Sequence, residues 1–235
     1  MKKYFREEEL AYFLQFIIPN TVMKSLVILL ISSTILFACN NGSDSHEAHT
    51  DTSMTADTTH MGGMDTDPNS MMGMMNLNMQ QIKSIVSTGH PDHDFAAVMK
   101  LHHQGAVQMS EMELAQGQDS TMKEMARKSM EEQNKEIAIL DKYLSGHGDH
   151  KGGDTLHRRL IEIMNSSPMN MDHSGTIDRQ FATMMIPHHQ QAIDMSKAYL
   201  NSNPQVQELK SLANKIIEDQ EKEIKELQGW LAKNQ

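Results

Sequence analysis

The sequence has a single cysteine among 235 residues, and only 5% of its residues are aromatic. One cysteine cannot form an internal disulfide, a cysteine-based zinc site or an iron–sulfur cluster. Basic residues are also scarce, since 21 Lys and Arg face 31 Asp and Glu for a formal charge of −10. Because phosphate binding needs a clustered basic face, we expect no nucleic-acid partner.

Long hydrophobic runs are equally few, and the main one lies near the start of the chain. Residues 23–39 comprise a Met, Lys24, an apolar run that ends at Phe37, and then Ala38 and Cys39. This pattern resembles a bacterial lipoprotein signal peptide with its lipobox. The apolar run is about half the ~20 residues that a membrane-spanning helix needs. We therefore expect a signal peptide at 23–38 and lipidation of Cys39.

The segment before this signal is acidic, with three glutamates at positions 7–9 where a signal peptide needs a basic start. We interpret residues 1–22 as an upstream start extension and Met23 as the true start. The alternative is an ordinary anchor helix that continues from earlier apolar residues, but Pro19 interrupts it. Processing would leave a chain acylated on Cys39, anchored to a membrane of the cell envelope and facing the periplasm or the exterior.

Residues 39–80 contain almost no aliphatic side chain, and their composition predicts a disordered tether. Methionines and histidines, which ordinary linkers lack, accompany its Ser, Thr, Asp and Gly. Thioethers and imidazoles are ligands for soft ions such as Cu(I) and Ag(I). In the tether and in a second rich segment at 146–175, these residues are Met54, His60, Met61, Met64, Met71, Met72, Met74, Met75, His147, His150, Met169, Met171 and His173.

An internal repeat appears when the chain is compared with itself at an offset of 86 residues. Residues 95–110 align with 181–196 and share Phe, Ala, a His-His pair, Gln, Ala, Met and Ser. At an offset of 87, residues 131–137 align with 218–224. Apolar residues recur at helical spacing in both copies, so each copy predicts a pair of helices.

Two helical hairpins can bury the apolar faces that neither covers alone, which predicts an all-α four-helix bundle. The first helix of each hairpin should begin after Asp92 or Asp178, which are favourable N-cap residues. We expect hairpin 1 at 81–145, a His/Met-rich connector at 146–175 and hairpin 2 at 176–235.

The His-His pairs are the candidate chemistry of this bundle. Adjacent helical residues point about 100° apart, so one His of each pair can face the axis while the other points sideways. Methionines lie one or two turns away on shared faces, as a soft-metal site requires. The predicted metal ligands are His102, His103, His188, His189, Met99, Met109, Met184, Met185 and Met195.

A packing role for the same residues stays open. An axial histidine can hydrogen-bond a glutamine across the core, and Gln133 and Gln220 interrupt the apolar stripes of the partner helices. Methionine is also a common core filler. The repetition of the His pair with methionine in both hairpins favours metal binding.

At these residues the chain resembles the family called domain of unknown function number 305, which is ferritin-like, mostly bacterial and extracytoplasmic. The resemblance covers about residues 90–235, and the first copy departs from it by ending in Tyr143-Leu144. It implies a ferritin-like bundle, and some members are associated with copper binding and copper tolerance. The matching residues of the second copy are Asp178, Phe181, Met184, His188, His189, Ala192, Met195, Gln220, Glu223, Ile224, Trp230 and Leu231.

Enzyme signatures are missing from the sequence. A di-iron oxidase needs Glu-x-x-His on its helices, and no His of the two pairs has a Glu three residues before it. Metalloprotease, nucleophile-elbow and phosphate-loop motifs are also missing, although a His-based acid/base or redox enzyme stays open. We expect no organic cofactor.

These observations predict a lipid-anchored, non-catalytic protein that binds copper, as Cu(I), with Ag(I) as a second ion. We expect it to buffer copper or to pass it to copper-efflux or other periplasmic copper proteins. The alternative is a structural or partner-binding bundle with core histidines and no metal.

Overall fold

The computed structural model describes residues 65–146, 155–166 and 175–234, which belong to one compact unit. These residues form six α-helices and no strand. None of these helices is both long enough and apolar enough to span a membrane. The helices are α3 (Met71–Lys83), α4 (Pro91–Gln116), α5 (Ser120–Gly146), α6 (Thr155–Ser166), α7 (Ile177–Leu200) and α8 (Gln207–Lys233).

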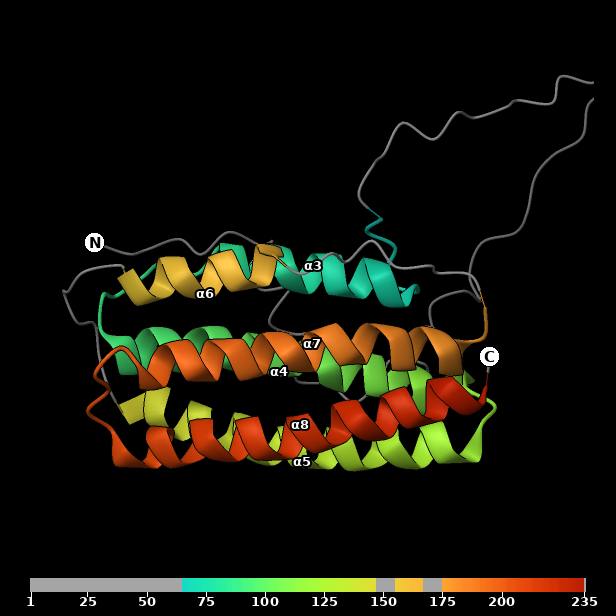
Figure 1. Ribbon diagram of the computed structural model, residues 1–235. Helices are drawn as coiled ribbons and strands as arrows, with labels where there is room; N and C mark the ends of the chain where they lie inside the picture. Colours follow the sequence, from blue (N-terminus) through green and yellow to red (C-terminus); the bar gives the residue numbers. More distant parts are fainter. Residues whose placement is uncertain (1–64, 147–154, 167–174, 235) are drawn as a thin grey trace, which may run out of the picture. The chain divides into compact units, whose positions relative to one another are not determined.

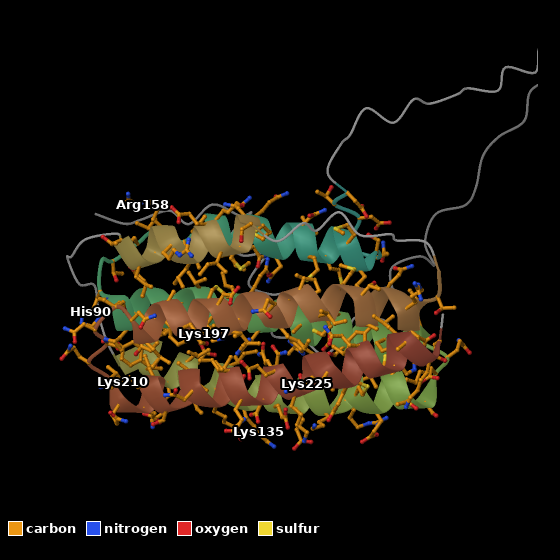
Figure 2. The ribbon with its side chains drawn as sticks, viewed as in Figure 1. His90, Lys135, Arg158, Lys197, Lys210 and Lys225 are labelled. Atoms are coloured by element: carbon orange, nitrogen blue, oxygen red, sulfur yellow. The ribbon has the colours of Figure 1, made fainter. Side chains whose placement is uncertain are left out.

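The four long helices form the predicted bundle of two hairpins, α4 with α5 and α7 with α8 (Figure 1). Helices α4 and α7 pack against each other in the middle layer, and α5 and α8 lie on one side of it. Helices α3 and α6 cover the other side. Lys135, Lys197, Lys210 and Lys225 project from the outer surface of the bundle (Figure 2). The all-α, ferritin-like four-helix fold is confirmed.

Asp92 and Asp178 lie inside the first turns of α4 and α7 rather than at the N-caps. Helix α4 begins at Pro91 after His90, and Thr176 caps α7 by accepting the N–H of Arg179. The N-cap prediction was therefore wrong, because both aspartates have partners in the other hairpin.

Each of these aspartates joins its hairpin to the start of the second helix of the other hairpin. Asp92 accepts the hydroxyl proton of Tyr199 at 2.5 Å and the N–H groups of residues 205–206 at 3.1–3.3 Å. Asp178 accepts the N–H groups of residues 118–119 at 2.7–2.8 Å. These N–H groups precede α8 and α5, where the first turn of a helix leaves donors unpaired.

Helix α3 corrects the prediction that the tether extends to residue 80. Ser70 opens the helix by accepting the N–H of Gly73 at 2.9 Å. The side chains of Met71 and Met75 are only 1% and 2% exposed and pack into the core. Composition misled the prediction, because methionine fills a core as an aliphatic residue does. The remaining tether, residues 39–64, and Cys39 lie outside the described residues.

Helix α6 corrects the connector predicted at 146–175. Its leucines at 156 and 160 are buried against α4 and α7. Hairpin 1 begins at Pro91 rather than at residue 81, because residues 81–83 are the end of α3 and a connection follows them. The connector residues His147, His150, Met169, Met171 and His173 lie outside the described residues.

The buried side chains form two clusters of different chemistry. The first, the aliphatic cluster, is built around Ile82, Phe95, Leu140, Leu160 and Tyr199. The second, the methionine cluster, is dominated by methionine and draws these residues from α3, α4, α5 and α7. Its methionines are Met71, Met72, Met75, Met109, Met112, Met122, Met184 and Met185.

Candidate metal centre

The four predicted histidines are buried near the middle of α4 and α7, and each is at most 1% exposed. The rings of His102 and His188 stack, with centroids 3.7 Å apart and planes 25° apart. Burial, and after it the neighbouring histidines, holds the pKa of both well below the usual value. Both imidazoles are therefore neutral at physiological pH and keep the lone pair that a metal needs.

His103 and His189 point away from this stack, each toward a glutamate on the second helix of its own hairpin. Nε2 of His103 lies 2.9 Å from Oε2 of Glu136, and Nε2 of His189 lies 2.7 Å from Oε2 of Glu223. The predicted arrangement of one axial and one sideways histidine is present in both pairs. The ring N–H groups are not aligned with the carboxylate oxygens, so these are close polar contacts rather than well-formed hydrogen bonds.

The glutamates leave Nδ1 as the nitrogen available to a ligand. A carboxylate only accepts, so it favours a proton on Nε2 of the neighbouring imidazole and a lone pair on Nδ1. Nδ1 of His103 and Nδ1 of His189 are buried and have no hydrogen-bond partner. Burial alone would raise the pKa of Glu223, but contact with His189, together with Glu132 and Lys128, outweighs it and lowers that pKa.

Glu136 and Glu223 were not among the predicted site residues. Helical spacing from Gln220 predicts Ile224 as the next inward residue, whereas the structure buries Glu223 and leaves Ile224 half-buried. Positions 223 and 224 both fit helical spacing from 220, and hydrophobicity favoured the isoleucine. A glutamate at the same position of both copies was the available signal.

Gln133 and Gln220 are buried, but neither bonds a histidine. Gln133 instead donates to Oγ of Ser129 at 3.4 Å. The partner of His102 is Gln191, whose Oε1 lies 3.4 Å from Nε2 of the ring. The prediction of two axial glutamines was therefore wrong about which residues reach the histidines.

The repeat places Gly105 where the second copy has Gln191. A Cβ at Gly105 would lie 2.9 Å from Oδ1 of Asn78, so glycine permits the close approach of α3. His188 consequently lacks the amide partner that His102 has, and neither of its ring nitrogens makes a well-formed hydrogen bond. Of the two stacked imidazoles, that of His102 thus has a hydrogen-bond partner, whereas that of His188 has none.

The five predicted methionine ligands are all buried, but the structure distributes them between the two clusters. Met99 and Met195 belong to the aliphatic cluster, and Met109, Met184 and Met185 belong to the methionine cluster. Packing accounts for methionines in such surroundings as well as metal binding does. Met185 has a further feature, because it lines a cavity together with His189.

This cavity, called the His189 cavity here, lies among α5, α7 and α8 and measures about 10 Å³. Met125, Ser129, Met185, His189 and Glu223 contribute to its lining. A volume of about 10–15 Å³ admits a single water-sized body. The cavity therefore has room for one ion and none for an organic substrate.

The donors beside the buried imidazoles combine soft and hard atoms. In the part of the chain that the structure describes, no three His, Cys, Asp or Glu side chains converge into a metal-binding group. At the His189 cavity the donors are two thioethers, an imidazole, a hydroxyl and two carboxylates. Thioether and imidazole ligands together fit Cu(I) or Ag(I) better than Mg²⁺ or Ca²⁺.

The family model described as Domain of unknown function (DUF305) matches residues 41–144 and 178–235. The chain belongs to the DUF305 family. The resemblance inferred from the two His-His repeats is thus confirmed. Among curated proteins, none is significantly similar to the chain.

Solved structures similar to this DUF305 chain include two forms of a protein named CopM. The Cu(I)-bound form is 29% identical, with a TM-score of 0.48, and the match covers 60% of this chain and 96% of CopM. The Ag-bound form obtained by soaking is 28% identical, with a TM-score of 0.47 and coverages of 60% and 95%. A DUF305 fragment from Deinococcus radiodurans is 24% identical, with a TM-score of 0.46 and coverages of 61% and 96%.

Proposed function

We propose that this DUF305 protein is a non-catalytic, extracytoplasmic copper-binding protein that takes up Cu(I), with Ag(I) as a second ion. It holds the metal in store or passes it to a copper-efflux or other periplasmic copper protein. The observation that carries the proposal is a buried imidazole, His189, which has an unpaired Nδ1 and lines a cavity together with Met125 and Met185.

The chemistry of the chain supports a soft monovalent ion as the cargo. The sequence holds 22 Met and 13 His but one Cys, so thioether and imidazole are its abundant soft donors. Thioethers carry no charge and bind without releasing a proton, whereas imidazoles must be neutral to bind. His102 and His188 are held in that neutral form by burial.

Anchoring at the membrane is the second part of the proposal. Acylation of Cys39 would hold the bundle at the envelope, where metal entering the periplasm or leaving the cell passes. Cys39→Ser should abolish acyl labelling of the chain, measured with labelled palmitate in growing cells. Persistent labelling of that variant would refute the anchor without touching the copper proposal.

The alternative function is a structural bundle whose histidines only pack. The stack of His102 on His188 and the contact of His102 with Gln191 favour it for the axial pair. Replacement of all four paired histidines by Gln separates the two functions, because Gln keeps a hydrogen-bonding side chain but loses imidazole coordination.

We expect this quadruple variant to remain helical by circular dichroism but to lose Cu(I)-induced stabilisation. Metal that binds only the folded chain raises the melting temperature, whereas loop ligands that bind folded and unfolded chains alike do not. Melting curves and anaerobic Cu(I) titration of the purified protein measure both effects. His157→Gln on α6 is the matched control and should behave as the parent. Unchanged copper stabilisation with a large fall in melting temperature would support the structural alternative.

A further inference from the structure

The two sideways histidines are related by the repeat, but the residues that face them are not the same. Helix α5 supplies Met125 and Ser129 to the lining of the His189 cavity. The equivalent positions of α8, 87 residues later, are Leu212 and Ile216. Both of these belong to the aliphatic cluster, together with Met99, the counterpart of Met185. One half therefore offers two thioethers and a hydroxyl where the other offers one thioether and hydrocarbon.

We infer that the His189 cavity is the one soft-metal site of the bundle's interior and that Met125, Met185 and Nδ1 of His189 hold the ion. The equivalent surroundings of His103, called the His103 half, hold none; those of His189 are called the His189 half. The inference rests on the proposed function and assigns it to one of two sites that the repeat makes equivalent.

The imidazole of His189 is positioned for this role. The residue is buried, and its Nε2 lies 2.7 Å from Oε2 of Glu223. A carboxylate behind a ligating histidine fixes the ring and raises its basicity. Glu223 is thus a positioning residue, and Nδ1 of His189 is the ring nitrogen that has no carboxylate beside it and no hydrogen-bond partner.

The two thioethers come from different helices. Met185 lies four residues before His189, so both side chains occupy the same face of α7. Met125 reaches the cavity from α5 and is only half-buried, unlike Met185. An unbranched thioether at the edge of a cavity can change rotamer and close on an ion. Two sulfurs and one nitrogen meet the low coordination number that soft monovalent ions accept.

A lysine lies near each of the two sites, and the two lysines have different carboxylate partners. Lys128 and Lys215 occupy equivalent positions, but Lys128 lies 4.0 Å from Glu226, whereas Lys215 lies 3.5 Å from Glu136. The position equivalent to Glu226 is Ile139, so that acid is missing near His103, where Lys215 instead pairs with Asp219 of its own helix as well as with Glu136. An ammonium beside Glu136 repels a cation at His103 and competes for the carboxylate.

The opening of the cavity is not locked by its ion pair. Lys128 and Glu226 both line it, and each is about 40% exposed. Exposed ion pairs are worth about 0–1 kcal/mol, so they part readily. An ion can therefore enter between α5 and α8 without unfolding of either helix.

The test replaces both thioethers while keeping the core filled. Met125→Leu with Met185→Leu is close to volume-conserving, so the fold should persist. The matched control is Met99→Leu, at the position equivalent to Met185. Each purified protein is titrated anaerobically with Cu(I) against a chromophoric competitor, and its melting temperature is measured with and without Cu(I). X-ray absorption of the loaded proteins counts sulfur and nitrogen neighbours.

We expect the double variant to lose one Cu(I) equivalent, or to bind it at least tenfold more weakly, and to lose most of the Cu(I)-induced rise in melting temperature. The control should keep both. If Met99→Leu loses the equivalent and the double variant keeps it, or if both keep it, the assignment to His189 is overturned while copper binding stands. If the parent protein shows no Cu(I)-induced stabilisation, the proposed function itself fails.

Discussion

The two repeats place a histidine, at residue 103 or 189, against an equivalent glutamate, but the other side chains around the two histidines differ. The polar framework is duplicated, because each copy keeps the His–Glu contact and the aspartate that joins the opposite hairpin. The lining is not duplicated, since one side is aliphatic and the other is rich in methionine. The framework stabilises the fold in both halves, which leaves the lining of one half free to acquire a ligand set.

The contacts of Asp92 and Asp178 with the opposite hairpin, called the two joints, also share an aspartate but differ in the side chain beside it. Tyr199 donates to Asp92, and the repeat places Glu113 in the equivalent position, beside Asp178. Burial, and then Asp178, raises the pKa of Glu113 to about 8. Below that pH Glu113 keeps its proton and can share it with Asp178, as the tyrosine hydroxyl does with Asp92. One joint has a permanent proton and the other has a titratable one.

Removal of the joints should give the largest loss of stability. Asp92→Ala leaves a tyrosine hydroxyl and two N–H groups unpaired, at about 1–3 kcal/mol for each buried group. We expect a total of about 3–5 kcal/mol, and a smaller loss for Asp178→Ala, which also removes the charge beside Glu113. Urea unfolding measures both. Asp141→Ala, which breaks a surface pair with Lys100, should cost less than about 1 kcal/mol.

A greater loss for Asp178→Ala than for Asp92→Ala would show that the two joints do not differ as their hydrogen bonds indicate. It would also imply that Glu113 stabilises its joint more strongly than Tyr199 does.

The copies also differ at Gly105 of α4, where the lack of a side chain lets α3 approach closely. Gly105→Ala places a Cβ 2.9 Å from Oδ1 of Asn78, whose Nδ2 is held by the carbonyl of Leu101 at 2.8 Å. Asn78 cannot move without breaking that bond, so we expect a loss of about 1–3 kcal/mol and faster proteolysis within α3. Gly229→Ala meets nothing within 4 Å and is the matched control. It should be neutral or stabilise by up to about 1 kcal/mol, since alanine favours helix.

The repeat and its helical periodicity were sufficient to predict the four long helices and the burial of both His pairs. Helix α3 could not be predicted in this way, because only tertiary packing shows that Met71 and Met75 fill a core rather than bind metal on a free chain. The partners of the histidines depended on which face of α8 turns inward. Helical periodicity cannot decide between Glu223 and Ile224 as the buried residue, because both fit the spacing from Gln220. Met125 and its cavity depend on how α5 meets α7, which only the structure shows.

The titratable joint should make stability depend on pH. The folded pKa of Glu113, about 8, lies above the ordinary value of 4.5 that a solvated chain has. Between these pH values the unfolded chain has released the proton and the folded chain has kept it, so the free energy of unfolding falls as pH rises. The slope is at most about 1.4 kcal/mol per pH unit. Glu113→Gln should flatten the urea-unfolding free energy between pH 5 and about 8.

Tyr199→Phe is the comparison for the other joint. The pKa of Tyr199 is raised, first by burial and then by Asp92, so the hydroxyl does not titrate in this range. The variant should lose stability by a similar amount at every pH. A slope that Glu113→Gln leaves unchanged, or that Tyr199→Phe removes, would contradict the assignment of the titratable proton.

The smallest effect is expected when the His103 half is given the lining of the His189 half. Leu212→Met with Ile216→Ser on α8 supplies the thioether and hydroxyl that the surroundings of His103 lack, and Met99 already lies one turn before His103. Lys215 remains 3.5 Å from Glu136 and opposes a cation, so the new site should bind Cu(I) more weakly than the original one. We expect a second Cu(I) equivalent in anaerobic titration, with an affinity about tenfold lower, which corresponds to about 1.4 kcal/mol. Addition of Ile139→Glu, the counterpart of Glu226, should draw Lys215 aside and recover part of that difference. A double variant that gains no equivalent, in a protein whose His189 cavity binds one, would show that the lining alone does not distinguish the two halves.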